Sequence, residues 1–106
     1  MDAFEITNII AEQQESGQPY LEFLRVPALS AGLYALPAGG VDPQKPHAED
    51  ELYYIISGRG QIRVAGEDRP VGPGSLIYVQ AQVEHRFHAI TEDLKILVFF
   101  APAESS

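Results

Sequence analysis

The chain lacks cysteine altogether, since none occurs among its 106 residues. This absence excludes disulfide bonds, zinc sites built from thiolates and a cysteine nucleophile. Any bound metal ion must therefore be held by histidine and carboxylate side chains. The sequence offers three histidines and fifteen aspartates and glutamates for that purpose.

Basic residues are also scarce. Seven lysines and arginines stand against fifteen acidic residues, which gives a net charge of −8, and the seven are scattered along the chain. An acidic protein repels the phosphate backbone of nucleic acids and the headgroups of anionic lipids. We therefore expect neither a nucleic acid nor a membrane surface as a partner.

Long apolar runs are missing as well. None approaches the roughly 18 to 20 residues of a membrane-spanning helix, and the first residues lack the basic and apolar regions of a signal peptide. The composition, with 45% hydrophobic and 21% charged residues, is that of an ordinary soluble domain with one hydrophobic core. We therefore expect a single cytoplasmic domain that spans residues 1–106.

Several well-known catalytic motifs are absent too. The sequence has no G-x-S-x-G elbow, no P-loop and no G-x-G-x-x-G after a predicted strand, which argues against common hydrolase, nucleotidase and dinucleotide-binding sites. The glycine clusters at 57–60 and 71–74 are typical of turns, where glycine supplies positive φ angles.

What the sequence does contain is a series of short β-like runs between turn residues. The runs span residues 20–26, 32–36, 47–57, 61–65, 75–79, 85–90 and 94–100. Such a series predicts an all-β sandwich or small barrel rather than a parallel α/β sheet. Residues 2–15 fit a short amphipathic helix, with Ile6, Ile9, Ile10 and Gln13 near one face, although a strand is an alternative there.

One of these runs begins with an unusual polar stretch. His47, Glu49 and Glu51 occupy every second position directly before the apolar residues 52–56. Because successive side chains of a strand point to opposite faces, the three are expected to share one face. Unpaired charges on a buried face are costly, and a divalent metal would neutralise them. Alternatively, the stretch is a solvated strand entrance without ligands.

The spacing around this stretch resembles the first motif of the cupin superfamily, G-x5-H-x-H-x3/4-E-x6-G. Gly39, His47, Glu51 and Gly58 fit that motif, whereas Lys45 stands in place of its first histidine. The resemblance extends over roughly residues 32–100.

A later stretch resembles the second cupin motif, G-x5-P-x-G-x2-H-x3-N. Gly74 and His85 match it, while Gln80, Gln82 and Ala89 replace its proline, second glycine and asparagine. The resemblance implies a double-stranded β-helix, also called a jelly-roll or cupin barrel. It also implies that the two motifs lie on neighbouring strands with their ligands converging inside.

Carried over to this chain, the resemblance makes His47, Glu51 and His85 metal ligands. Lys45 cannot ligate while protonated, so its ammonium is expected to reach solvent or to pair with Glu49. By strand parity Glu49 is a further candidate ligand that replaces the lost histidine. Two histidines and one carboxylate suit a divalent transition metal such as Fe, Mn, Zn or Ni. Glu51 has an alternative role as an acceptor that orients an imidazole.

Three hypotheses for the function follow from this resemblance. The first is a metal-dependent enzyme, of the dioxygenase or isomerase type, that acts on a small organic molecule. The second is a non-catalytic module that binds a metal or a small ligand as a sensor or store. The third is a metal-free structural cupin in which His47 and the glutamates form a hydrogen-bonded cluster.

Two structural expectations complete the reading of the sequence. Counted from His85, strand alternation points Phe87 into the barrel and His88 away from it. The stretches 20–24 and 96–100 are more apolar than one strand face requires. Since small cupins commonly pair through such surfaces, we expect a homodimer.

Overall fold

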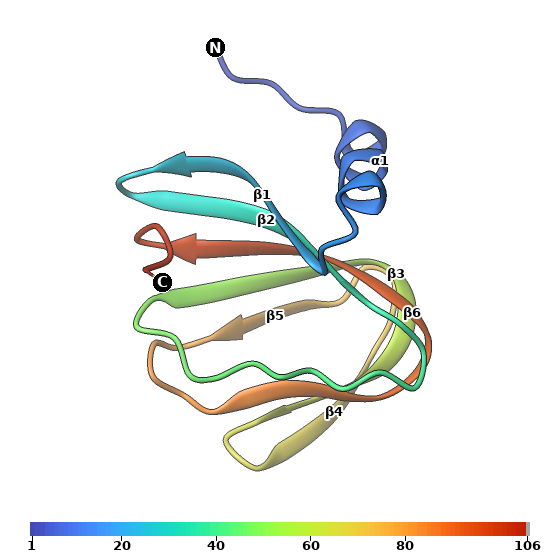
Figure 1. Ribbon diagram of the computed structural model, residues 1–106. Coiled ribbons are helices and arrows are strands. Elements are labelled where there is room, and N and C mark those ends of the chain that lie inside the picture. Colours follow the sequence, from blue (N-terminus) through green and yellow to red (C-terminus); the bar gives the residue numbers. More distant parts are fainter. Residues whose placement is uncertain (106) are drawn as a thin grey trace.

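A computed structural model describes residues 1–105 of the chain, and in it one helix precedes six strands (Figure 1). The elements are α1 (Ile6–Ser16), β1 (Tyr20–Val26), β2 (Leu29–Leu36), β3 (Asp50–Val64), β4 (Glu67–Val71), β5 (Leu76–Val79) and β6 (His85–Ala101). All strand pairs are antiparallel, in the order β1-β2-β6-β3-β4, and β5 pairs with β3. No helix in this part of the chain is long and apolar enough to cross a membrane.

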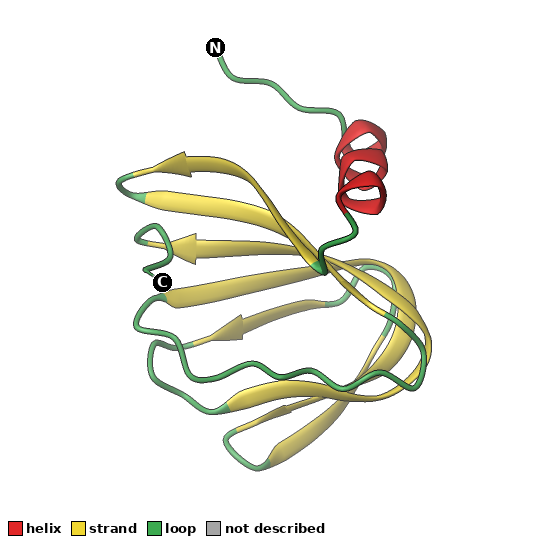
Figure 2. Ribbon diagram, viewed as in Figure 1, coloured by secondary structure: helices red, strands yellow, loops and turns green. Residues whose placement is uncertain are grey.

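The two longest strands, β3 and β6, determine the shape of the molecule. They pair over the full length of β3, from Asp50 to Val64, while β5 and β4 pair with its first and second halves. Register shifts interrupt the β3–β6 pairing between Ile55 and Gln61, and both ribbons curve strongly (Figure 2). The sheet thus folds over on itself as a double-stranded β-helix, which confirms the predicted all-β fold.

The core lies between the two halves of this folded sheet. It consists of Tyr34, Leu36, Tyr53, Ile55, Ile62, Val71, Val79, Phe87, Ile90, Leu94, Ile96, Val98 and Phe100. Strand alternation is clear in β3, where Glu51, Tyr53 and Ile55 are buried and Leu52 and Tyr54 are exposed.

The structure corrects several predicted element boundaries. The runs 47–57 and 61–65 form one continuous strand, as do 85–90 and 94–100, because β3 and β6 bend instead of turning back. Strand β4 was missed because its residues are mostly charged and exposed, as is common at a sheet edge. The helix alternative for the N-terminal run is confirmed. Ile9 and Gln13 are the buried residues of α1, and Gly17 ends it with a φ of 69°.

Exposed apolar side chains gather on the outer face of β3 and β5. Leu52 lies opposite Tyr78, and Tyr54 lies opposite Leu76, with between 38% and 65% of each residue exposed. This patch differs from the stretches 20–24 and 96–100 that the sequence suggested for pairing. The homodimer stays a prediction.

Gly58 allows the bend of β3, and its replacement is expected to destabilise the fold. Its φ is 94°, and an added Cβ would overlap the carbonyl oxygen of Asp93 in β6. We expect Gly58→Ala to lower the free energy of unfolding by about 2–4 kcal/mol, from backbone strain and overpacking together. Urea unfolding followed by circular dichroism measures this loss.

Gly66→Ala is the matched control. Gly66 has a similar φ of 82°, but an added Cβ would meet nothing within 4 Å. Only the strain of about 1–2 kcal/mol remains there. Equal losses for the two variants would show that the contact with β6 is unimportant.

Candidate metal centre

Three predicted ligands meet at one end of the barrel. Glu51 is the second residue of β3, His85 is the first residue of β6, and His47 lies in the connection between β2 and β3. One potential ligand atom from each lies within 4.8 Å of the other two. Glu51 and His85 are only 2% and 3% exposed, whereas His47 is partly exposed.

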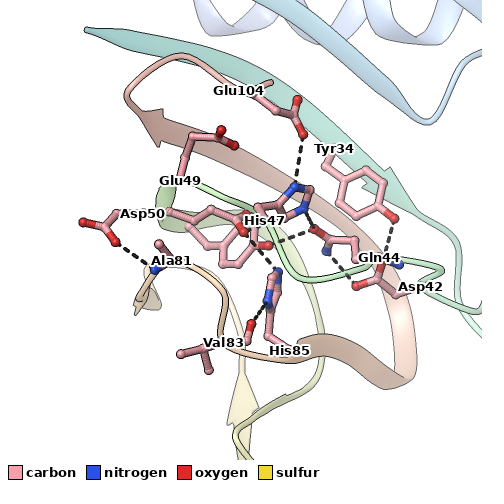
Figure 3. A network of polar contacts seen from close by, with 12 residues as sticks. Tyr34, Asp42, Gln44, His47, Glu49, Asp50, Ala81, Val83, His85 and Glu104 are labelled. Atoms are coloured by element: carbon pink, nitrogen blue, oxygen red, sulfur yellow. Dashed lines mark hydrogen bonds and ion pairs between the residues drawn. The ribbon is translucent and has the colours of Figure 1, made fainter. Parts of the chain in front are cut away.

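The hydrogen bond of His85 determines which of its nitrogens faces the site. Nδ1 lies 2.9 Å from the carbonyl oxygen of Val83 (Figure 3). Because a carbonyl only accepts, Nδ1 carries a proton and donates it. Nε2 then points at Oε1 of Glu51, at 3.2 Å.

This contact between His85 and Glu51 leaves buried polar atoms without partners. The 3.2 Å separation is an ion-pair distance, but within residues 1–105 neither Nε2 of His85 nor Oε2 of Glu51 makes a hydrogen bond. Two buried acceptors that face each other are unfavourable unless a proton or a cation lies between them. The donor set therefore fits a divalent cation, since neutral imidazole and carboxylate suit transition metals.

The proton is the competitor of such a cation at His85. Burial lowers the pKa of His85, but the close contact with the Glu51 carboxylate and the hydrogen bond to the Val83 carbonyl outweigh it and raise the pKa above its ordinary value. A raised pKa means that the protonated pair with Glu51 stabilises the metal-free fold below the unfolded pKa. This stabilisation is lost as pH rises through the folded pKa. Metal ligation requires the deprotonated form and so has the opposite pH dependence.

His47 is held between two groups of acceptors. Its Nε2 lies 3.8 Å from Oε1 of Glu51 and 3.3 Å from Oε1 of Gln44. Its Nδ1 lies 3.4 Å from Oε2 of Glu104, and the ring packs edge-on against Phe100 with centroids 5.1 Å apart. The imidazole therefore presents Nε2 to the candidate ligand group and Nδ1 to the C-terminal residues.

The fourth candidate ligand, Glu49, lies outside this group. Its carboxylate is buried, but Oε2 accepts hydrogen bonds from the backbone and the hydroxyl of Ser105. Strand β3 begins only at Asp50, so the alternation that placed Glu49 beside Glu51 does not extend that far back. Lys45 is exposed, and within the described chain it forms no ion pair with Glu49.

Sequence reasoning missed Gln44, which brings an amide oxygen into the site. This oxygen accepts a hydrogen bond from the hydroxyl of Tyr53 at 3.0 Å. The Gln44 amide nitrogen donates to the buried Asp42 at 2.8 Å, which also accepts from Tyr34 at 2.7 Å. Burial and the charge of Glu51 raise the pKa of Tyr53, which keeps its hydroxyl protonated as a donor. In the sequence, only the polar run "DPQ" at 42–44 could have indicated the role of Gln44. The motif spacing indicated Lys45 instead.

A cavity of about 190 Å³ opens beside His47. It is lined by Tyr20, Tyr34, Gln44, His47, Val98, Phe100 and Glu104. The Tyr20 ring lies against Gly32, where any Cβ would clash with it. Its buried hydroxyl has no partner in residues 1–105, and burial together with Glu104 raises its pKa. The cavity thus combines aromatic and aliphatic walls with a hydroxyl donor and a carboxylate.

His88 and Phe87 take the positions predicted for them. Nε2 of the half-buried His88 lies 2.8 Å from Oδ1 of Asp68 on the outside of the barrel. Phe87 is 1% exposed and packs edge-on against Tyr53 with centroids 5.0 Å apart. The structure thus separates His88 from the other two histidines.

Comparison with known proteins identifies the family of the chain. A family model described as "Cupin domain" matches residues 32–100. An uncharacterized protein of Streptomyces coelicolor, SCO3923, is 50% identical over 105 residues, which are 99% of this chain and 100% of that protein.

Two solved structures show the same fold at low sequence identity. The protein TT1209 from Thermus thermophilus is similar with a TM-score of 0.75 and 23% identity over 97% of this chain and 99% of its own. KdgF from Halomonas sp. is similar with a TM-score of 0.72 and 23% identity over 78% of this chain and 76% of its own.

Proposed function

Because the chain belongs to the cupin domain family, we propose that it binds one divalent transition metal and uses it to convert a small organic molecule. His47, Glu51 and His85 would hold the metal. The observation that carries this proposal is the buried, unpartnered Nε2 of His85, which faces a Glu51 carboxylate within reach of His47. Two neutral imidazoles and one carboxylate leave coordination positions open for substrate.

The chemistry of such a site is Lewis-acid polarisation of a substrate oxygen or activation of dioxygen. This pair of possibilities corresponds to an isomerase or a dioxygenase. The residues of the chain supply the rest: Val83 fixes the protonated nitrogen of His85, and Tyr53 holds the amide oxygen of Gln44 beside His47. The buried ring of Phe100 packs against His47, and that of Phe87 packs against Tyr53.

The volume and the lining of the cavity limit the size and the charge of the proposed substrate. Its volume of about 190 Å³ is below the roughly 300–1,000 Å³ of pockets that take drug-sized ligands. Within the described chain its lining includes the carboxylate of Glu104 but no lysine or arginine. The side chain of Glu104 repels an anionic group, so we propose a small substrate with an apolar body whose end beside Glu104 is uncharged or cationic.

Metal loading tests this proposal directly. We expect EDTA-treated protein to gain stability when Mn²⁺, Zn²⁺ or Ni²⁺ is added aerobically, or Fe²⁺ anaerobically. At a hundredfold excess over the dissociation constant the gain is about 2.7 kcal/mol, measured as a rise in melting temperature. It should be larger near about pH 8 than near about pH 5.5, because protons compete for His85 at the lower pH.

The outcomes separate the hypotheses for the function. A shift with metal, followed by turnover or dioxygen uptake with small uncharged or amine substrates, supports the enzyme. A shift without turnover in such a screen favours a binding module. No shift with any of these metals at either pH would contradict a metal site.

A further inference from the structure

The chain after β6 is fixed against the barrel and leads into the candidate metal centre. We call residues 102–105 the C-terminal segment. The backbone N–H of Ala103 donates to the carbonyl oxygen of Pro27, at 3.3 Å. The N–H of Glu104 donates to the hydroxyl of Ser30, at 2.8 Å, and Arg25 donates to the carbonyl oxygen of Glu104, at 2.7 Å.

The end of the segment is fixed as well. The N–H and the hydroxyl of Ser105 donate to Oε2 of the buried Glu49, at 3.2 and 2.7 Å. In Figure 1 the C-terminal segment accordingly ends close to the start of β3. The segment lies outside residues 32–100, which the family model matches. The position of the C-terminal segment therefore depends on its own contacts with β1, with β2 and the turn between them, and with the residue before β3.

These contacts aim the side chain of Glu104 at His47. Oε2 of Glu104 lies 3.4 Å from Nδ1 of His47, and the two side chains are only 25% and 20% exposed. Figure 3 shows the carboxylate reaching the imidazole from the side opposite to Gln44. Glu104 also lines the cavity beside His47.

The two ring nitrogens of His47 face different side chains. Nε2 lies 3.8 Å from Oε1 of Glu51 and 3.3 Å from Oε1 of Gln44. Because the amide oxygen of Gln44 only accepts, Nε2 carries a proton in the metal-free structure and would lose it to a bound metal. A histidine that ligates a metal through one nitrogen carries its proton on the other, where an acceptor fixes the tautomer and the ring orientation. For His85 the carbonyl oxygen of Val83 is that acceptor. For His47 the group in the equivalent position is the carboxylate of Glu104.

We propose that Glu104 is the positioning residue of the metal centre: its carboxylate accepts the Nδ1 proton of His47 and so directs the Nε2 lone pair at the metal. This proposal rests on the metal site proposed above. It makes metal affinity depend on the C-terminal segment, and by linkage the bound metal stabilises the docked segment to the same extent. Glu104 itself does not ligate, because it lies on the side of His47 that faces away from Glu51 and His85.

The test compares zinc affinities of the full chain and its variants by competition with a chelating dye. We expect Glu104→Ala to bind zinc about 10- to 100-fold more weakly than the wild type. Glu104→Gln should lose less, because its amide oxygen still accepts the proton. The matched control is Glu67→Gln, which removes the same charge from an exposed position on β4 and should leave the affinity unchanged.

A spectroscopic readout separates positioning from a merely structural role. In the zinc-loaded wild type, the Nδ1 proton of His47 should give a slowly exchanging, downfield-shifted resonance in nitrogen-15-labelled protein. It should move in Glu104→Gln and disappear into exchange with water in Glu104→Ala. A general loosening of the fold would not act on this proton while sparing the Nδ1 proton of His85.

Three results would overturn the proposal, and each is distinct. Equal zinc affinity and an unmoved His47 resonance in Glu104→Ala would remove Glu104 from the centre while leaving the metal site intact. Loss of an oxygen ligand from the zinc X-ray absorption spectrum of Glu104→Gln would make Glu104 a ligand instead. Failure of the wild type to bind zinc, iron, manganese or nickel would contradict the metal site itself. If Glu104→Ala does not fold, the near-isosteric Glu104→Gln decides among these results.

Discussion

Replacing His85 with alanine is expected to abolish stoichiometric metal binding. Structural zinc sites of four ligands have apparent binding free energies of about 10–16 kcal/mol, or about 3 kcal/mol per ligand. Loss of one of only three protein ligands should therefore weaken binding at least about 100-fold. Metal content measured by mass spectrometry after desalting should fall from about one ion per chain in the wild type to background.

The chain offers a close control for this experiment. His88 lies three residues further along β6 and pairs with Asp68 on the outside of the barrel. His88→Ala removes the same side chain type from the same strand and should retain the metal. Equal metal content in the His85→Ala and wild-type proteins would contradict the proposed centre. Circular dichroism checks that His85→Ala is folded, and His85→Gln serves if it is not.

Much of this centre follows from local sequence rules. Strand alternation places Glu51, Tyr53 and Ile55 on the inner face of β3, and the same rule points His85 and Phe87 inward from β6. These predictions succeed because the side-chain period of a strand is a local property of the backbone. The motif spacing then adds the pairing of distant segments, which alternation alone does not give.

The rule fails where the chain leaves the strand. Alternation was extended from Glu51 back to Glu49 and His47, yet β3 begins at Asp50. The positions of His47 and Glu49 depend on the loop before β3 and on the C-terminal segment, whose contacts link residues more than fifty positions apart. Glu104 could not be predicted from the sequence for the same reason.

The position of Lys45 also depends on the loop before β3 and not on strand alternation. Motif spacing places Lys45 where a ligand histidine is usual, and a protonated lysine cannot ligate a metal there. In the structure Lys45 is exposed, and the preceding residue, Gln44, turns inward. Asp42 causes this arrangement, because its carboxylate accepts hydrogen bonds from both the backbone and the side chain of Gln44. The exposed lysine therefore leaves the ligand group accessible to a cation.

Asp42 is accordingly a residue outside the ligand group whose loss should cost much stability. It is 4% exposed and accepts from the Tyr34 hydroxyl, from Gln44 and from the backbone N–H of Phe87 at 2.9 Å. Removing one partner from a buried polar network leaves the others unsatisfied, at about 1–3 kcal/mol each. We expect Asp42→Ala to lower the free energy of unfolding by about 3–5 kcal/mol, measured by urea unfolding of the metal-free protein.

Asp93 offers a matched control for this prediction. The Asp93 carboxylate accepts a single hydrogen bond in the described chain, from the backbone N–H of Ala38 at an exposed position. Asp93→Ala should therefore cost only about 1 kcal/mol. If the two variants unfolded at the same urea concentration, Asp42 would be no more than another surface acceptor, and the orientation of Gln44 would need a different cause.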